Sequence, residues 1–183
     1  AGGGGFQEIE SDEEDVLARF FDCSKAYDLD VIIRVTSDCP LIDGDLIREA
    51  YEDYHEMDSE DIHYSCNVKH TYPHGLNFEI FSFKLLHDAH LNANTPFFRE
   101  HVTPYIIQNI SGCVSLRHFV RSSDASHYRI TVDTQSDFDL IKLLIEKHDA
   151  HKMDAEQIVD LFERYPELSL INRGQTHVWG DGT

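Results

Sequence analysis

The amino-acid sequence predicts an α/β fold with a mainly parallel sheet. A helical pattern over 11–27 is followed by an apolar strand from residue 30 and by a second helix from residue 43, and this succession is typical of that fold class. The strand is a nearly continuous β-branched run, as expected for a strand covered on both faces. Hydrophobic residues make up 41% of the 183 positions, enough for the core of one domain.

We place this domain at 11–172, between a flexible lead over 1–10 and a loose tail over 173–183. The lead contains four consecutive glycines and has no structural signal of its own. The tail is polar and glycine-rich, which argues against a continuing helix or strand there.

The composition excludes several classes of protein. The 34 acidic residues outnumber the 15 Lys and Arg residues, giving a net charge of -19, so we expect no nucleic-acid partner. Any phosphate ligand would then need a metal. The four cysteines form no Cys-x-x-Cys pair, which argues against a disulfide framework or a zinc knuckle. No apolar run of membrane-spanning length or signal-peptide pattern occurs, so we expect a cytoplasmic protein with no membrane partner, and a homodimer remains open.

The first elements lead to an acid at the end of a strand. Ser11 and Glu14 have the spacing of a capping box, which opens the first helix. The strand cannot continue past Pro40, which has no amide hydrogen to donate, so the chain leaves the sheet near Asp38. Asp43 is then placed to cap the second helix.

The middle of the chain contains short strands and a turn. We expect strands over 62–68 and 76–83, separated by a turn at 71–75 that a proline and a glycine mark. Glu79 is an acid inside the second of these apolar strands. Such an acid lies either at a sheet edge, where it is harmless, or in a ligand cleft, where it has a role.

Two helices and two strands are expected next. The helices cover 85–91 and 98–109. The second is interrupted or preceded by Thr103-Pro104, because proline is tolerated in a first turn and disruptive later. The strands cover 114–120 and 127–133, and the second of them ends in Asp133.

The last two helices have clear start signals. Thr134 and Asp137 form a capping box, and the helix that follows has apolar residues at the spacing of core packing. Asp154 caps a final helix that ends near Arg164.

Asp38 and Asp133 occur at equivalent points of the predicted fold, because each ends a predicted strand where the chain turns toward a helix. In open α/β sheets, ligands bind beyond the carboxyl ends of strands. Two such carboxylates can share one Mg²⁺, which prefers one or two protein carboxylates and takes other oxygens from water and phosphates. Taken singly, each acid has an ordinary alternative: a solvated loop acid for Asp38 and a helix N-terminal acid for Asp133.

Five stretches also carry a resemblance to a known family. They cover 14–20, 36–43, 75–83, 99–106 and 131–134, in the family's order, within roughly 13–172. They resemble the cytidylyltransferase family that includes the spore-coat polysaccharide SpsF proteins. More distantly, the chain is similar to the enzymes that activate 3-deoxy-manno-octulosonate and acylneuraminates as CMP-sugars.

The resemblance implies a GT-A-like, nucleotidyltransferase-like three-layer sandwich with a mixed, mainly parallel sheet. It also implies transfer of CMP from CTP to a sugar or sugar acid with release of pyrophosphate. It implies Asp38, within Ser37-Asp38-Cys39-Pro40, and Asp133 as the catalytic Mg²⁺ ligands. Other matched positions would lie near the sugar. These are Tyr72, Gly75, Leu76, Glu79, Arg99, Glu100 and His101.

The chain departs from the family pattern at its start. Family members begin with a strand and a loop of Gly, Arg and Lys residues that grips the nucleotide, and the glycines at 2–5 lack the accompanying basic residues. We therefore expect an N-terminally truncated domain whose sheet has one or two strands fewer. Ser37 also replaces the usual glycine of the metal-acid motif.

Two alternatives to a cytidylyltransferase follow from the residues. Without the basic loop, the chain would be an inactive fragment or a non-catalytic binding or assembly module. A metal-dependent glycosyltransferase would instead use Asp43-Gly44-Asp45 as an Asp-x-Asp metal motif, although Asp43 is better explained as a helix cap.

Overall fold

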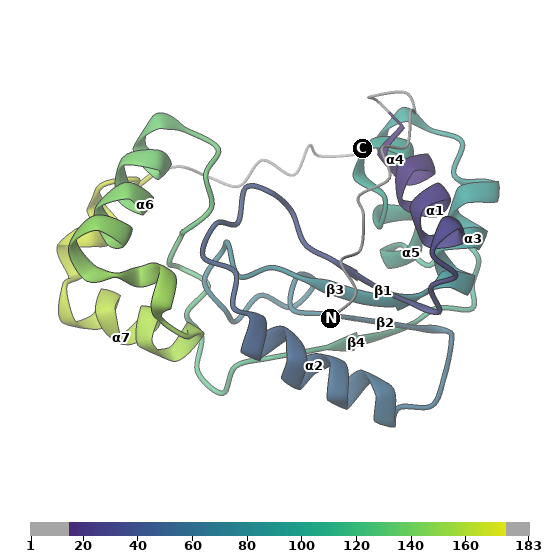
Figure 1. Ribbon diagram of the computed structural model, residues 1–183, viewed down its shortest axis with the longest axis horizontal. Helices are drawn as coiled ribbons and strands as arrows, with labels where there is room; N and C mark the ends of the chain where they lie inside the picture. Colours follow the sequence, from purple (N-terminus) through teal and green to yellow (C-terminus); the bar gives the residue numbers. More distant parts are fainter. Residues whose placement is uncertain (1–14, 175–183) are drawn as a thin grey trace. The chain divides into compact units, whose positions relative to one another are not determined.

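The computed structural model describes residues 15–174 and has a mixed α/β architecture (Figure 1). The four strands are β1 (Val31–Arg34), β2 (Ile62–Ser65), β3 (Glu79–Ser82) and β4 (Ser115–His118). The α-helices are α1 (Val16–Ala26), α2 (Gly44–Glu56), α3 (Phe83–Asn92), α4 (Pro96–His101), α5 (Pro104–Ile107), α6 (Gln135–His148) and α7 (Ala155–Arg164). Two 3₁₀ helices, η1 (Ala150–Lys152) and η2 (Pro166–Leu170), complete the elements. None of these helices has the length and apolar character needed to cross a membrane.

The strands form one sheet in the order β1-β3-β2-β4. The Phe83 amide donates to the Asp30 carbonyl at one end of the β1–β3 pair, and Arg34 contacts Glu79 at the other, so β3 runs antiparallel to β1. Ser115 and Phe119 donate to Asp61 and Ser65, which makes β4 parallel to β2. The α/β fold with a mixed sheet is confirmed, and the strand pairs include an antiparallel one (β1–β3) as well as a parallel one (β2–β4).

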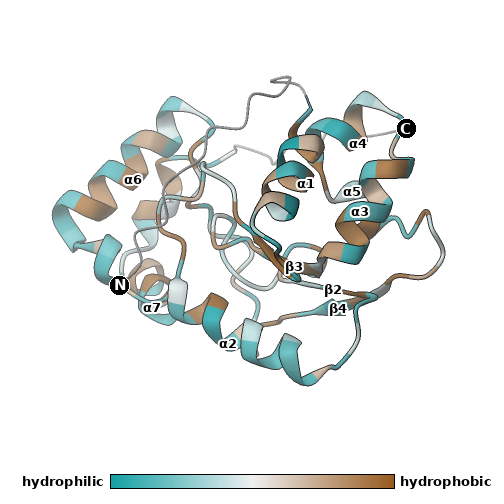
Figure 2. Ribbon diagram, turned by 45° about the vertical axis from the view of Figure 1, so that its right-hand side comes forward, coloured by the Kyte–Doolittle hydropathy of each residue, from teal (hydrophilic) through white to brown (hydrophobic). Residues whose placement is uncertain are grey.

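The chain divides into two compact units, and each contains one end of every strand. Of the described residues, the first comprises 15–32, 60–63 and 81–116, and the second comprises 33–59, 64–80 and 117–174. The first unit therefore contains α1, α3, α4 and α5. The second contains α2, α6 and α7. Figure 2 shows that the helices carry both hydrophobic and hydrophilic residues.

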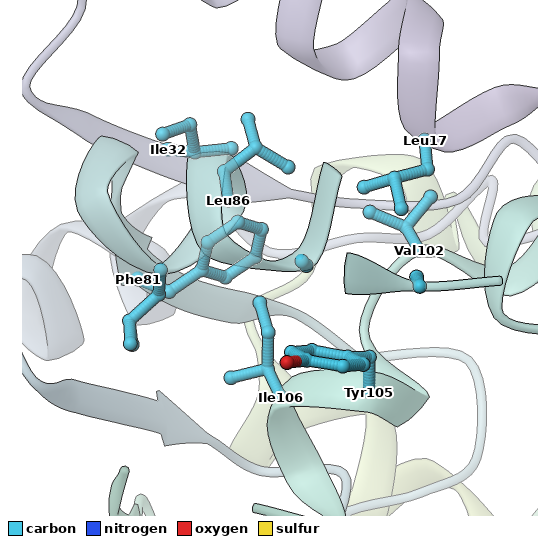
Figure 3. Close-up of a cluster of buried hydrophobic side chains, with 10 residues drawn as sticks. Leu17, Ile32, Phe81, Leu86, Val102, Tyr105 and Ile106 are labelled. Carbon is cyan, nitrogen blue, oxygen red and sulfur yellow. The ribbon is translucent and has the colours of Figure 1, made fainter. Parts of the chain in front are cut away.

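The first unit is built on a buried cluster from α1, α3 and the short helices that follow. Figure 3 shows Leu17 beside Val102, and Phe81 beside Leu86, with Ile106 and Tyr105 below them. Fully burying side chains of this size contributes about 1.5–3 kcal/mol each, so this cluster is the main support of the unit.

Several predicted boundaries are corrected by the structure. The N-cap of α1 is Asp15, not Ser11, which lies with Glu14 outside the described residues, as do the predicted lead over 1–10 and positions 175–183 of the tail. The strands are shorter than predicted, and β3 ends at Ser82, which caps α3. The interruption expected near Thr103-Pro104 in the helix over 98–109 is confirmed: Val102, with φ +69°, and Thr103 separate α4 from α5.

The predicted caps of the other helices are confirmed. Asp43 caps α2, and Asp154 caps α7 with Gln157 completing a capping box. Thr134 and Asp137 form the capping box of α6. These caps fix the starts of the helices that follow the acidic loops of the second unit.

Candidate functional site

Asp38 lies in a tight turn directly after β1. The Cys39 amide donates to the Thr36 carbonyl (3.2 Å), and the Thr131 hydroxyl donates to the Asp38 carboxylate (2.9 Å). Burial raises the pKa of Asp38, but hydrogen bonds from the hydroxyls of Thr36 and Thr131 outweigh it and hold the pKa below its usual value. No Lys or Arg of residues 15–174 forms an ion pair with this carboxylate. Asp38 is therefore an ionised acid held by neutral donors.

The 128–132 segment joins the Asp38 turn to the loop at His74. The His74 amide donates to Tyr128, the Ile130 amide donates back to the His74 carbonyl, and the Val132 amide donates to the Asp38 carbonyl (2.8, 2.7 and 2.8 Å). The strand predicted over 127–133 is wrong, because within the described chain this stretch forms only an isolated bridge between His74 and Arg129. The segment nevertheless brings Asp133, the residue after Val132, to the Asp38 turn.

The Cys39 thiol lies close enough to both acids to sense their charge. Burial raises the pKa of Cys39, and the negative charges of Asp38 and Asp133 raise it further, against the opposing hydrogen bond from Thr36. The thiolate is the form of cysteine that binds metals, so a raised pKa disfavours Cys39 as a ligand. The candidate ligands at the metal corner, as we call the site formed by Asp38 and Asp133, are their carboxylate oxygens.

These oxygens fit Mg²⁺ better than a transition metal. Mg²⁺ takes hard oxygen ligands and keeps several waters, so one or two carboxylates suffice. Over residues 15–174, no group of three or more His, Cys, Asp or Glu is placed to hold a metal ion. An ion bound by Asp38 and Asp133 would therefore take its other oxygens from water or from substrate phosphates.

Gly75 lies against the 128–132 segment with no room for a side chain. Its φ is +116°, and a Cβ there would lie 2.6 Å from the Ile130 carbonyl carbon and 2.7 Å from the Thr131 nitrogen. Gly75 thus has a structural reason to be glycine, because Thr131 is the residue that holds Asp38. The role of Gly75 on the sugar side stays a prediction.

Asp133 belongs to a second network built on Arg129. Arg129 donates to Asp133 through Nη2 and to both oxygens of Asp137, through Nε and Nη2, at 3.0 Å each. Asp137 also accepts from Thr134 and from the Asn172 amide (2.7 Å). Burial raises the pKa of Asp137, but these hydrogen bonds prevail and place it far below its usual value. The carboxylate of Asp133 therefore has a guanidinium as its neighbour.

Tyr72 lines a pocket of about 510 Å³ in the second unit. The ring stacks on Phe119 (5.7 Å), and burial together with the charges of Glu49 and Glu156 raises the pKa of Tyr72 to about 12. Six of the 13 lining residues are acidic, and neither Asp38 nor Asp133 is among the residues that line the pocket. Its relation to a sugar stays a prediction.

Leu76 and Glu79 are both buried in the second unit. Leu76 is fully buried, and its carbonyl accepts from the Cys66 thiol (3.4 Å). The Glu79 side chain is 1% exposed and forms an ion pair with Arg34 (2.7 Å). The acid inside the predicted strand thus has a specific cationic partner. Contact of either residue with a sugar stays a prediction.

Arg99, Glu100 and His101 belong to the first unit, in α4. Arg99 pairs with Asp15 through Nε and Nη2, and its Nη1 donates to the His90 carbonyl (2.9 Å). Glu100 is exposed, and the His101 ring meets the Phe97 ring edge-on at 4.8 Å. The guanidinium of Arg99 therefore joins α4 to the N-terminus of α1 and to α3. A role for these three residues near the sugar stays a prediction.

Asp15 should stabilise the first unit as a cap and as a counter-ion. Burial raises the pKa of Asp15, but hydrogen bonds from Arg99 and the Ala18 amide lower it below its usual value. Asp15→Ala should lower the free energy of unfolding by about 1–2 kcal/mol, because the cap is worth about 1 kcal/mol and a partly exposed ion pair less. Asp15→Asn should lose less, since Asn also caps.

Urea titration at neutral and acidic pH tests both variants. Because the pKa of Asp15 is lower in the folded protein, its charge stabilises the fold above the unfolded-state pKa and this contribution is lost as the pH falls through the folded-state pKa. The difference between wild type and Asp15→Asn should therefore shrink in acid. Equal destabilisation by Ala and Asn at neutral pH would contradict the cap.

Both carboxylate oxygens of Asp43 accept hydrogen bonds from amides at helix N-termini. Its Oδ1 accepts from the Asp45 and Leu46 amides (2.9 and 3.2 Å), and its Oδ2 accepts from the Ala155 amide (2.8 Å). These bonds join the starts of α2 and α7. They support the helix-cap interpretation over an Asp-x-Asp metal motif.

Residues essential to this geometry carried no individual signal in the sequence. Thr131 lay within a recognised motif, but its bond to Asp38 spans 93 positions. Asn172 and Arg129 reach Asp137 from 35 and 8 positions away. The sequence predicts Asp137 as a capping residue, but the capping-box pattern does not indicate that Asp137 also pairs with the buried guanidinium of Arg129.

Comparison with known proteins gives consistent matches. The family model described as cytidylyltransferase matches residues 1–174. An uncharacterized protein of Methanocaldococcus jannaschii, MJ1063, is 35% identical over 165 residues, covering 87% of this chain and 64% of that protein. The spore coat polysaccharide biosynthesis protein SpsF of Bacillus subtilis is 31% identical over 170 residues, covering 90% of this chain and 68% of SpsF.

A solved structure is similar as well. The structure of a cytidylyltransferase from Leptospira borgpetersenii serovar Hardjo-bovis superposes with a TM-score of 0.82 at 26% identity, over 90% of this chain and 68% of that chain. This chain thus spans 64% and 68% of the lengths of its two curated relatives.

Proposed function

Because this chain belongs to the cytidylyltransferase family, we propose that it transfers CMP from CTP to a hydroxyl group of a sugar or sugar acid. One observation carries the proposal: the hydrogen bonds from Thr131 and Val132 to Asp38 bring Asp133 to the same corner. The name of the relative SpsF, a spore coat polysaccharide biosynthesis protein, supports a product that serves polysaccharide synthesis.

The reaction is a displacement at the α-phosphorus of CTP. The acceptor hydroxyl oxygen forms a new bond to that phosphorus, and the bond to the bridging oxygen of the β-phosphate breaks. Pyrophosphate leaves, and the hydroxyl proton passes to solvent. Catalysis of such a transfer comes mainly from positioning and from neutralising the phosphate charge.

Asp38 and Asp133 are the residues that would hold Mg²⁺. When bound, the ion would neutralise phosphate charge and orient the leaving group. The hydroxyls of Thr36 and Thr131 keep Asp38 ionised and fix its direction. The Val132 amide holds the turn that presents it. The low basicity of Asp38 means that the proposed ligand is charged at any pH near neutrality.

The test is release of pyrophosphate by the chain given CTP, Mg²⁺ and a panel of sugars and sugar acids. We expect release only when CTP, the ion and an accepted sugar are all present, and EDTA should abolish it. UTP serves as the matched control nucleotide. Absence of release, with CTP binding retained in calorimetry, would favour a non-catalytic binding module. Transfer from a preformed nucleotide sugar without CTP would favour a glycosyltransferase.

A further inference from the structure

Asp133 and Asp137 share one guanidinium but differ in exposure. The Asp137 side chain is 0% exposed, and the Arg129 side chain is 11% exposed, whereas that of Asp133 is 45% exposed. Asp133 is thus the member of this trio that a cation from solvent can reach.

Arg129 also binds Asp137 through more hydrogen bonds than it binds Asp133. Two nitrogens hold Asp137 in a bidentate pair, but only Nη2 reaches Asp133. Asp137 is further fixed by Asn172 and by the Thr134 hydroxyl. Arg129 can therefore lose its bond to Asp133 and remain anchored on Asp137.

The main chain at Asp133 does not depend on this bond. The Asp133 and Thr134 amides both donate to Asp137 Oδ2, at 3.2 and 3.1 Å. The side chain of Asp133 thus projects from a fixed point whichever cation it faces. A guanidinium at this carboxylate repels a divalent ion and occupies one of its oxygens.

We propose that Arg129 holds Asp133 as its counter-ion before metal binds and thereby weakens the affinity of the corner for a free divalent cation. The inference rests on the proposed function, because it takes Asp133 as a metal ligand. Arg129 is a positioning residue in this scheme and touches no substrate. The corner then favours an ion that arrives with nucleotide phosphates, whose negative charge offsets the guanidinium.

Mn²⁺ binding to the full chain, followed by electron paramagnetic resonance without nucleotide, tests this proposal. Arg129→Gln should bind Mn²⁺ about tenfold more tightly than wild type, because a nearby positive charge is removed. A purely structural role predicts the opposite sign, since loss of a residue that orients a ligand weakens metal binding. Arg121→Gln is the matched control and should leave Mn²⁺ affinity unchanged, because Arg121 pairs with Glu156 instead.

Two further variants keep the test decisive. Arg129→Gln could leave Asp137 uncompensated and fail to fold, so Arg129→Gln/Asp137→Asn removes both buried charges together and should also bind Mn²⁺ more tightly. Adding Asp133→Asn to Arg129→Gln should abolish the gain. Equal or weaker binding in folded Arg129→Gln or in the double variant would overturn the inference.

The design separates this inference from the proposed function. If Asp133→Asn alone leaves Mn²⁺ affinity unchanged, Asp133 is not a ligand and the proposed metal corner fails with the inference. If Asp133→Asn weakens binding while removal of Arg129 does not strengthen it, only the inference about Arg129 fails.

Discussion

Asp38→Asn is expected to lower the rate of pyrophosphate release at least about a hundredfold, more than the loss typical of residues that merely support a metal ligand. The amide keeps the size of the side chain and can still accept from Thr131, but it removes the charge that the two threonine hydroxyls stabilise. The measurement is a coupled pyrophosphate assay at saturating CTP and Mg²⁺, with circular dichroism to confirm folding.

Asp45→Asn provides the matched control for Asp38→Asn. It makes the same change in charge at a residue whose side chain is 75% exposed and pairs with Arg48 on α2. We expect near wild-type pyrophosphate release from it. Loss of activity in Asp45→Asn together with full activity in Asp38→Asn would refute the assignment of Asp38 and support the Asp-x-Asp alternative.

Gly75→Ala is expected to lower the free energy of unfolding by about 2–4 kcal/mol, because it combines backbone strain with a clash. The added methyl group would lie under 3 Å from main-chain atoms of Ile130 and Thr131, which cannot rotate away as a side chain can. The 128–132 segment must move, and Thr131 with it. Pyrophosphate release should therefore fall as well.

Gly112→Ala is the control that separates the effect of backbone strain in Gly75→Ala from the effect of the steric clash. Gly112 also has a positive φ, +78°, but a Cβ there meets no atom within 4 Å. It should cost only the conformational penalty of about 1–2 kcal/mol and leave pyrophosphate release intact. Urea unfolding of both variants gives the comparison, and equal losses in the two would show that Ile130 and Thr131 yield freely.

Local sequence patterns predicted the parts of this structure that local forces determine. Asp43, Asp154 and the Thr134–Asp137 capping box satisfy amide groups a few residues away, so their spacing alone reveals them. The apolar run of β1 likewise predicts a strand without knowledge of its neighbours. These features place Asp38 after β1 and Asp133 directly before the N-cap of α6.

The features that escaped prediction depend on distant partners. The stretch at 127–133 has the composition of a strand, yet its amides pair with His74 and Asp38 outside the sheet. Asp15 replaces Ser11 as the cap of α1, where Arg99 from α4 also binds its carboxylate. A break near Thr103-Pro104 is expected in the helix over 98–109, but its position at Val102 depends on the burial of this residue in the core cluster. Tertiary contacts decide each of these cases, and a local pattern contains no information about them.

The hydrogen bonds of the 128–132 segment also limit which amino acids can occur there. The Ile130 and Val132 amides donate to the carbonyls of His74 and Asp38, and the Tyr128 amide donates to the Ala125 carbonyl. Proline has no amide hydrogen, so it is excluded at these three positions whatever the side chains around them. The main-chain hydrogen bonds that join the loop at His74 to the turn at Asp38 are supplied by every amino acid except proline. By contrast, the bond from the Thr131 hydroxyl to the Asp38 carboxylate depends on the identity of a side chain in this segment.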